Sequence, residues 1–220
     1  MTTQNLFRGI RSTLVAAVLS GTAATASATP LLSGNIEHIQ STQEQKGGSY
    51  ERFNGFYKLP GEVKGYTFGE FYHDGTNFIK HNLSRKVAGP VSLASQIKSV
   101  NEPLTDAGLG LQVAYFGKSG SYAVAKLLPL WMNKEGNSVK NREVLGFAIG
   151  TDLGSKVSVG IFGEINLKAK SGAEWAYGEC SVMYKVNKDW SFGYNPALRN
   201  KAKGSVIPRM ESRFALQRKF

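Results

Sequence analysis

The sequence predicts an all-β protein: an antiparallel, up-and-down transmembrane β-barrel of about twelve strands, with ten as the alternative count. Three observations lead to this fold class. Apolar and polar residues alternate with a period of two over most of the chain after residue 30. Turn signals interrupt this alternation at regular intervals. The connections alternate between tight turns and longer polar loops, which is typical of outer-membrane barrels.

Each candidate strand is defined by its own alternation and by the turns that bound it. In the clearest case, Val157, Val159 and Ile161 share one face, while small and polar residues occupy the other. The first candidate is only weakly patterned. In chain order, the candidates are residues 34–43, 50–59, 64–73, 76–86, 90–99, 107–117, 121–132, 142–151, 155–168, 173–186, 189–196 and 205–220.

The connections between these strands fall into two groups. If the C-terminus faces the periplasm, as in bacterial barrels, one rim receives only tight turns, and the other receives longer polar loops and one tight Asp-Gly hairpin at 73–76. The tight turns are expected at 60–62, 88–90, 117–120, 152–155 and 187–188. The longer loops are expected outside the cell, at 100–107, 133–141, 168–173 and 197–205.

The first 28 residues differ from the rest. Two arginines precede a short apolar run from Leu14 to Leu19, and an A-x-A motif ends at Ala28. This is the layout of a secretory signal peptide, and the run is too short to cross a bilayer. We expect residues 1–28 to be a cleaved signal peptide and residues 29–220 to be one barrel domain. The alternative is a frayed amphipathic N-terminus.

The charge of the mature chain limits its partners. The leader holds two of the 27 basic residues and none of the 16 acidic ones, so the mature net charge is 25 − 16 = +9. A basic chain can bind nucleic acid, anionic lipid or acidic solutes. Because we expect the chain to leave the cytoplasm, we expect no nucleic acid among its partners. A single cysteine, Cys180, excludes an internal disulfide framework. Outer-membrane lipid and small anionic solutes remain.

The three tryptophans lie at the ends of candidate strands. Trp131 precedes a long loop, Trp175 follows one, and Trp190 follows the turn at 187–188. Amphipathic rings at strand ends are typical of the interfacial girdles of membrane barrels. The alternative is ordinary core tryptophan in a soluble β-sandwich.

The C-terminal segment "RFALQRKF" resembles the last strand of bacterial outer-membrane β-barrel proteins, which ends in phenylalanine after alternating apolar residues. In that class the barrel-assembly machinery recognises this strand. The resemblance implies that Phe214, Leu216 and Phe220 form the assembly signal and face lipid. Arg218 departs from the pattern, although a long basic side chain near a rim can extend to the headgroups.

Two narrower resemblances concern the type of barrel. The strand number, the terminal phenylalanine and the segments "FGEFY" (68–72) and "LSRKVAGP" (83–90) are similar to the nucleoside-specific channel family. The size and basic character resemble small porins for acidic oligosaccharides. Neither resemblance has a diagnostic motif in this sequence, so neither assigns ligand residues.

The same alternation turns basic side chains toward the lumen. On 50–59, outward Phe53 and Tyr57 turn Arg52 and Lys58 inward. A Lys or Arg facing lipid at the midplane would cost about 2–4 kcal/mol, so the central ones must face inward. The residues that we assign to the lumen and its selectivity are Arg52, Lys58, Lys80, Lys98, Lys126, Arg209, Glu211 and Arg213. Acids on this face are few: Glu164, Glu179 and Glu211.

A lumen lined by cations favours anions. The alternative is that the basic residues only brace Glu164, Glu179 and Glu211 inside a plugged barrel. Barrel size leaves this open, because eight strands are filled by side chains and sixteen leave an aqueous channel.

The sequence shows no convincing catalytic, metal or cofactor site. His73 and His81 flank the Asp-Gly hairpin, and "GKSG" at 117–120 lacks the first glycine of a P-loop. We therefore predict no enzyme activity, no metal and no cofactor. The predicted function is passive diffusion of small, hydrophilic, anionic solutes through the outer membrane of a Gram-negative bacterium. The alternatives are a lipid-modifying enzyme that uses His73 or His81, and a closed structural or adhesin-like barrel.

Overall fold

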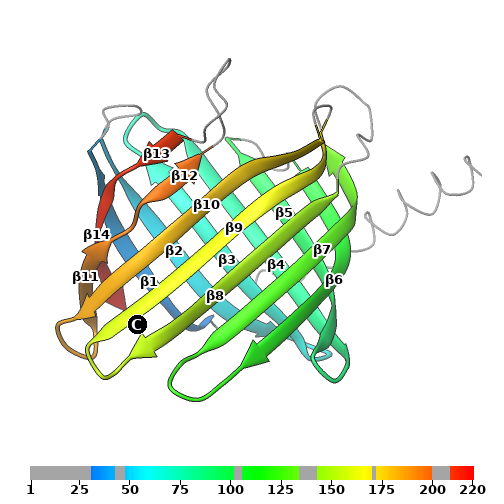
Figure 1. Ribbon diagram of the computed structural model, residues 1–220, viewed down its shortest axis with the longest axis horizontal. Helices are drawn as coiled ribbons and strands as arrows, with labels where there is room; N and C mark the ends of the chain where they lie inside the picture. Colours follow the sequence, from blue (N-terminus) through cyan, green and yellow to red (C-terminus); the bar gives the residue numbers. More distant parts are fainter. Residues whose placement is uncertain (1–30, 43–47, 102–105, 134–142, 170–171, 200–208) are drawn as a thin grey trace, which may run out of the picture.

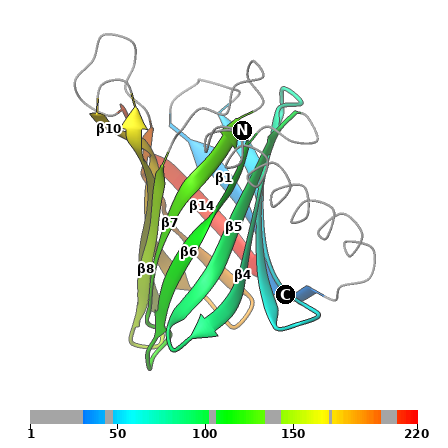
Figure 2. The ribbon, with the colours of Figure 1, turned by 90° about the vertical axis from the view of Figure 1, so that its right-hand side faces the viewer.

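The chain forms one antiparallel sheet that curls into a closed barrel (Figures 1 and 2). The computed structural model describes residues 31–42, 48–101, 106–133, 143–169, 172–199 and 209–220. The expected signal peptide lies outside these residues. The strands are β1 (Leu31–Ser41), β2 (Ser49–Leu59), β3 (Val63–Tyr72), β4 (Asn77–Ala88), β5 (Val91–Val100), β6 (Asp106–Phe116), β7 (Tyr122–Asn133), β8 (Val144–Leu153), β9 (Val157–Ala169), β10 (Gly172–Lys185), β11 (Trp190–Tyr194), β12 (Ala197–Arg199), β13 (Arg209–Glu211) and β14 (Arg213–Lys219).

The fourteen segments make twelve barrel strands, because two strands are each interrupted once. β11 and β12 are two parts of one strand, because both pair with β10. β13 and β14 are two parts of the next strand, because β13 pairs with β12 and β14 pairs with β11. The ring closes where β14 pairs with β1, from Asn35↔Lys219 to Ser41↔Arg213. The predicted fold class and the count of twelve are confirmed.

Several strand boundaries differ by a few residues from those predicted, for example at β1 and β8, and one difference turns an expected loop into a strand. Residues 197–199 form β12, although the sequence suggested a loop from 197 onward. Pro196 interrupts the strand because it has no N–H to donate to a neighbour. Its carbonyl still accepts from the Cys180 N–H at 3.0 Å, so the pairing with β10 resumes at Ala197.

The tight turns gather at one end of the barrel, at 60–62, 89–90, 117–120, 154–156 and 186–189, as the alternation of connections predicted (Figure 1). Turns this short need residues in the left-handed region, and Gly61 and Gly154 supply it with φ of 72° and 70°. We call this end the tight-turn end. Much of the expected long loops at the other end, 102–105, 134–142, 170–171 and 200–208, lies outside the described residues.

The two faces of the sheet differ in chemistry as the alternation requires. Large apolar side chains are exposed on the outer face, for example Leu111 (54%) and Phe192 (52%). The interior holds polar groups instead, and thirteen of the buried residues in the described part are polar or charged against eleven apolar ones. This distribution is inverted relative to a soluble core and suits a lipid-facing outer wall. Among the described residues, no helix is long and apolar enough to cross a membrane.

Candidate functional site

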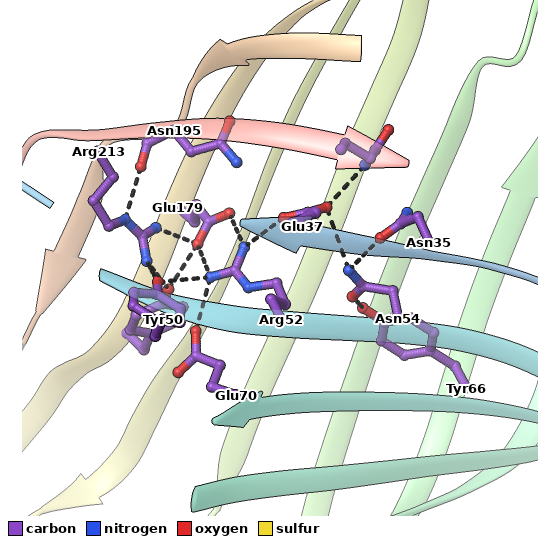
Figure 3. Close-up of polar contacts among 12 residues, drawn as sticks. Asn35, Glu37, Tyr50, Arg52, Asn54, Tyr66, Glu70, Glu179, Asn195 and Arg213 are labelled. Carbon is purple, nitrogen blue, oxygen red and sulfur yellow. Dashed lines mark hydrogen bonds and ion pairs between the residues drawn. The ribbon is translucent and has the colours of Figure 1, made fainter. Parts of the chain in front are cut away.

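One cluster of buried charges inside the barrel centres on Arg52. The register of β2 places Arg52 directly opposite Glu37 on β1 and Glu70 on β3. The guanidinium lies 2.8 Å from the Glu70 carboxylate and 3.4 Å from that of Glu37. It also donates to both carboxylate oxygens of Glu179 on β10, at 2.7 and 2.8 Å (Figure 3). Three strands lie between β2 and β10, so the Glu179 contact crosses the interior.

Arg213 shares Glu179 with Arg52. Arg213 is completely buried, and it donates to the Glu179 carboxylate and to the Tyr50 hydroxyl. Its Nε donates to the backbone oxygen of Asn195 at 2.9 Å, at the point where β11 ends (Figure 3). The Tyr177 hydroxyl donates to Glu179 at 2.7 Å. Glu179 therefore ties β2, β10 and β14 together.

We call Arg52, Arg213, Glu37, Glu70 and Glu179 the arginine cluster. Amide and hydroxyl groups satisfy much of the remaining hydrogen-bonding capacity of its carboxylates. Gln217 donates to Glu37 at 2.8 Å, and Tyr72 donates to Glu70 at 2.7 Å. Two guanidinium groups face three carboxylates, so the cluster carries no excess of positive charge.

A second cluster centres on Glu164 of β9. Lys98 lies 2.6 Å from the Glu164 carboxylate, Lys80 lies 3.2 Å from it, and Lys126 lies 3.9 Å from it. Gln96 donates to the same carboxylate at 2.9 Å. We call Lys80, Lys98, Lys126 and Glu164 the lysine cluster. Three ammonium groups face one carboxylate, so its formal charge is 3 − 1 = +2.

Repulsion between two of its lysines makes the lysine cluster locally destabilising. Lys80 and Lys98 are directly opposite on β4 and β5, and like charges in that relation destabilise a sheet. Glu164 offsets the repulsion from across the lumen, since four strands lie between β4 and β9 on one side of the ring and six on the other. Lys126 is held by Asn82, whose Oδ1 it reaches at 2.5 Å, and by Gln96.

An aromatic pair joins the two clusters. The Phe68 and Phe162 rings meet edge to face with centroids 6.4 Å apart. They come from β3 and β9, which have five strands between them on either side of the ring, so this contact joins opposite walls. The Arg52 guanidinium lies 4.9 Å from the centroid of Phe68, and the Lys80 ammonium lies 5.6 Å from it. Side chains therefore meet across the interior at this level.

The structure places most of the predicted lumen residues on the inner face. Arg52, Lys80, Lys98, Lys126 and Arg213 lie in the two clusters. Glu211 is buried on the inner face, opposite Ala197. Lys58 is exposed at the tight-turn end, where it is directly opposite Lys64. The side chain of Arg209 lies outside what the structure describes.

Two features of this face go beyond the sequence prediction. Arg52 and Arg213 face the interior as predicted, but their side chains are only 3% and 0% exposed and are paired with acids. The acids are also more numerous than predicted, because Glu37 and Glu70 join the predicted Glu179. Period-two alternation alone places Glu70 on the inner face. Glu37 was harder to find because it lies on the weakly patterned first strand.

The three residues that the sequence assigns to the assembly signal face outward. Phe214, Leu216 and Phe220 are 54%, 47% and 56% exposed. Arg218 also faces outward, and its guanidinium lies 5.6 Å from the centroid of the Trp190 ring on β11. This part of the outer wall suits lipid contact, and the assembly signal stays a prediction.

The histidines lie away from both clusters. His73 is exposed at the hairpin 73–76, and its Nε2 is 3.0 Å from the Ser49 hydroxyl. His81 contacts the Thr67 hydroxyl at 2.8 Å on the outer face. Among the described residues, no group of three or more His, Cys, Asp or Glu side chains is arranged to hold a metal ion.

The solved structures that share this architecture include a KdgM porin and a KdgM porin in complex with disordered oligogalacturonate. Each aligns with a TM-score of 0.52 and 11% sequence identity, over 86% of this chain and 98% of its own. This barrel has the fold of a small outer-membrane porin. The predicted resemblance to small porin-type barrels is thereby confirmed at the level of fold. No protein-family model and no curated protein matches the sequence.

Proposed function

We propose that the barrel is an outer-membrane channel for the passive diffusion of small hydrophilic anions. The observation that carries this proposal is the lysine cluster, where three ammonium groups converge on a single carboxylate inside the barrel. Fixed positive charge in a narrow, poorly hydrated passage attracts anions and repels cations. The formal excess of +2 is therefore the source of selectivity.

The arginine cluster has a different role in this proposal. Its guanidinium groups are already matched by carboxylates and buried, so they have little charge to offer a solute. The lysine side chains are more accessible, with exposures of 11% for Lys80, 18% for Lys98 and 13% for Lys126. Of the two clusters, the lysine cluster is the one whose charged groups a solute in the barrel can reach.

The fold likeness supports a channel of this kind. KdgM is a porin, and one of its structures holds oligogalacturonate, which is a polyanion. The proposal also includes export through a cleaved signal peptide and insertion by the assembly machinery, which would recognise Phe214, Leu216 and Phe220. The exposed apolar outer wall supports residence in the outer-membrane lipid.

A closed structural barrel is the second candidate, and one observation favours it. The contact between Phe68 and Phe162 joins opposite walls. These rings and the cross-lumen ion pairs narrow the interior at this level. The channel proposal therefore requires a path beside the aromatic pair or movement of its rings.

The test is single-channel recording from the purified, refolded protein in planar bilayers. The channel proposal predicts discrete conductance steps and, in a KCl gradient, a reversal potential of the sign for chloride preference. If the protein is shown to be folded by its heat-modifiability on gels and still gives no conductance steps, the closed barrel is favoured. Steps with cation preference would retain a channel but overturn the assignment of the lysine cluster.

The contact between Ser49 and His73 does not support a lipid-modifying enzyme strongly. Its 3.0 Å distance fits a nucleophile and base, but His73 is exposed at a hairpin rather than held in a desolvated site. We assign it to packing at the rim. Covalent labelling of Ser49 by an organophosphonate probe, abolished in His73→Ala, would overturn this assignment.

A further inference from the structure

The outer surface at the tight-turn end carries two pairs of a cation and an aromatic ring. The Arg218 guanidinium lies 5.6 Å from the centroid of Trp190, and the Lys156 ammonium lies 6.0 Å from that of Tyr184. Trp190 and Tyr184 face outward, with exposures of 38% and 39%. Both pairs lie on the opposite side of the wall from the charged clusters, so the channel proposal does not explain them.

The register places the two pairs side by side. Trp190 on β11 is directly opposite Arg218 on β14. Tyr184 on β10 is opposite Phe192 on β11, and their ring centroids are 5.6 Å apart. Tyr184 and Trp190 lie on neighbouring strands, about 4.8 Å apart across the sheet, and the cation that contacts each ring lies one strand further out. The two cations are therefore about three strand spacings apart, roughly 14 Å, and their long side chains can reach a headgroup over the rings from both sides.

The turn between β10 and β11 is held in place beside these pairs. The Asn187 side-chain oxygen accepts from the backbone N–H groups of Asp189 and Trp190, both at 2.9 Å. The Asp189 carbonyl accepts from the Lys219 N–H at 2.8 Å. Lys188, exposed in this turn, brings a third cation to the same edge. With Asp189 as the acid of the turn, the local formal charge is 3 − 1 = +2.

The surface changes character toward the barrel centre. Phe192, Val182 and Leu216 continue the outer faces of the same strands and are 52%, 51% and 47% exposed. Cations with aromatic rings at the edge, followed by apolar side chains, match the order of headgroup and acyl chains in one leaflet. A free anion would gain nothing from the apolar part.

We propose that Lys156, Lys188 and Arg218, with Trp190 and Tyr184, form a binding site for an anionic phospholipid headgroup. The ligand class is phosphatidylglycerol or cardiolipin in the leaflet at the tight-turn end. A basic residue beside an anionic lipid surface favours binding roughly fivefold. The site therefore prefers phosphatidylglycerol to phosphatidylcholine, and the preference does not depend on conductance.

Trp190 provides the readout. In a Trp131→Phe, Trp175→Phe background it is the sole tryptophan, because the chain has three. The folded barrel is reconstituted in vesicles of phosphatidylcholine with increasing fractions of brominated phosphatidylglycerol, or of brominated phosphatidylcholine as reference. Quenching of Trp190 then reports which lipid lies against it. The test variant is Arg218→Gln with Lys156→Gln.

The matched control is Lys64→Gln with Lys86→Gln, because both lysines lie at the same end but alternate to the inner face. We expect brominated phosphatidylglycerol to quench Trp190 at a severalfold lower fraction than brominated phosphatidylcholine. The preference should fall severalfold in the test variant and persist in the control and in the presence of inorganic phosphate. Equal quenching by both lipids in the parent protein would overturn the proposal.

Two further results would also overturn it. An equal loss of preference in both double variants would assign the effect to the general potential of the basic rim. Displacement of the lipid by inorganic phosphate would indicate a site for the free anion. If the test variant fails to fold, Arg218→Lys with Lys156→Arg keeps both charges and should retain the preference. The salt dependence of the parent protein provides a second measurement, and the preference should decrease as ionic strength rises.

Discussion

The arginine cluster and the lysine cluster occupy the same barrel interior and both touch the Phe68 ring, yet their charges are arranged in opposite ways. In the arginine cluster, two guanidinium groups meet three carboxylates and are almost completely buried. In the lysine cluster, three ammonium groups share one carboxylate and remain partly accessible. Matched, buried charge fixes the strands relative to one another. Unmatched, accessible charge remains available to a solute.

The types of side chain reinforce this difference. A guanidinium group offers five donors in a fixed plane, so Arg52 and Arg213 can each bind several acceptors on different strands at once. An ammonium group is a more strongly hydrated point charge on a flexible stem. The comparison therefore predicts that the arginine cluster determines stability and the lysine cluster determines selectivity.

The largest effect is expected from breaking the arginine cluster. Arg213→Gln should lower the free energy of unfolding by about 3–5 kcal/mol, because removing one partner leaves Glu179 buried with less compensation. Urea unfolding in detergent, together with heat-modifiability on gels, measures the change. Lys58→Gln at the exposed rim is the control and should unfold like the parent protein. An Arg213→Gln barrel of parental stability would show that this cluster does not brace the fold.

A second effect, on conductance, is expected when the aromatic contact between opposite walls is removed. Phe68→Ala with Phe162→Ala removes the two rings that meet between opposite walls, so the single-channel conductance should rise. Phe53→Ala is the control, because Phe53 lies on the outer side of the wall, where its ring centroid is 6.2 Å from that of Phe220. Unchanged conductance in the double variant, with steps present, would place the passage elsewhere.

Neutralising the acid of the lysine cluster should increase its selectivity. Glu164→Gln raises the formal charge of the cluster from +2 to +3, so the preference for anions should become stronger. The variant should also lose some stability, because Lys80 and Lys98 are directly opposite and lose their shared counter-charge. Reversal potentials in a salt gradient measure the first effect. A shift toward cations would contradict the assignment of the cluster.

The smallest effect is expected at the rim of the tight-turn end. Lys58 and Lys64 are exposed and directly opposite each other. Replacing both with glutamine should weaken the anion preference slightly at low ionic strength. The difference should vanish near 1 M salt, where the Debye length is only about 3 Å. A difference that persists in high salt would mean that these lysines contact the solute directly.

The strands could be predicted because each depends on local information. On β9, the side chains of Val157, Val159 and Ile161 point to one face as their period of two requires, and the turn at 154–156 is marked by Gly154. Ala197 was misplaced because Pro196 looks like the end of a strand when its neighbour is unknown. The hydrogen bond from the Cys180 N–H of β10 to the Pro196 carbonyl is not visible in the sequence.

The charged clusters could be predicted only in part. Alternation identifies the face of a side chain, so the inward positions of Arg52 and Lys80 followed from the sequence. It does not identify the partner across the lumen, because Glu179 is 127 residues from Arg52 and Glu164 is 84 residues from Lys80. Whether an inward cation is matched or unmatched depends on these long-range contacts. For that reason the sequence placed Arg213 among the selectivity residues, whereas its contacts with Glu179 and Asn195 lead us to propose a bracing role.

The most direct test of the division between the clusters is the reversal potential of Lys80→Gln with Lys98→Gln, recorded beside the parent protein in the same KCl gradient. The double variant changes the formal charge of the lysine cluster from +2 to 0 and leaves the arginine cluster intact. We predict a folded channel whose reversal potential moves from chloride preference toward the value of a non-selective pore. A folded variant that keeps the parental reversal potential would contradict the account, since the selectivity would then arise outside the lysine cluster.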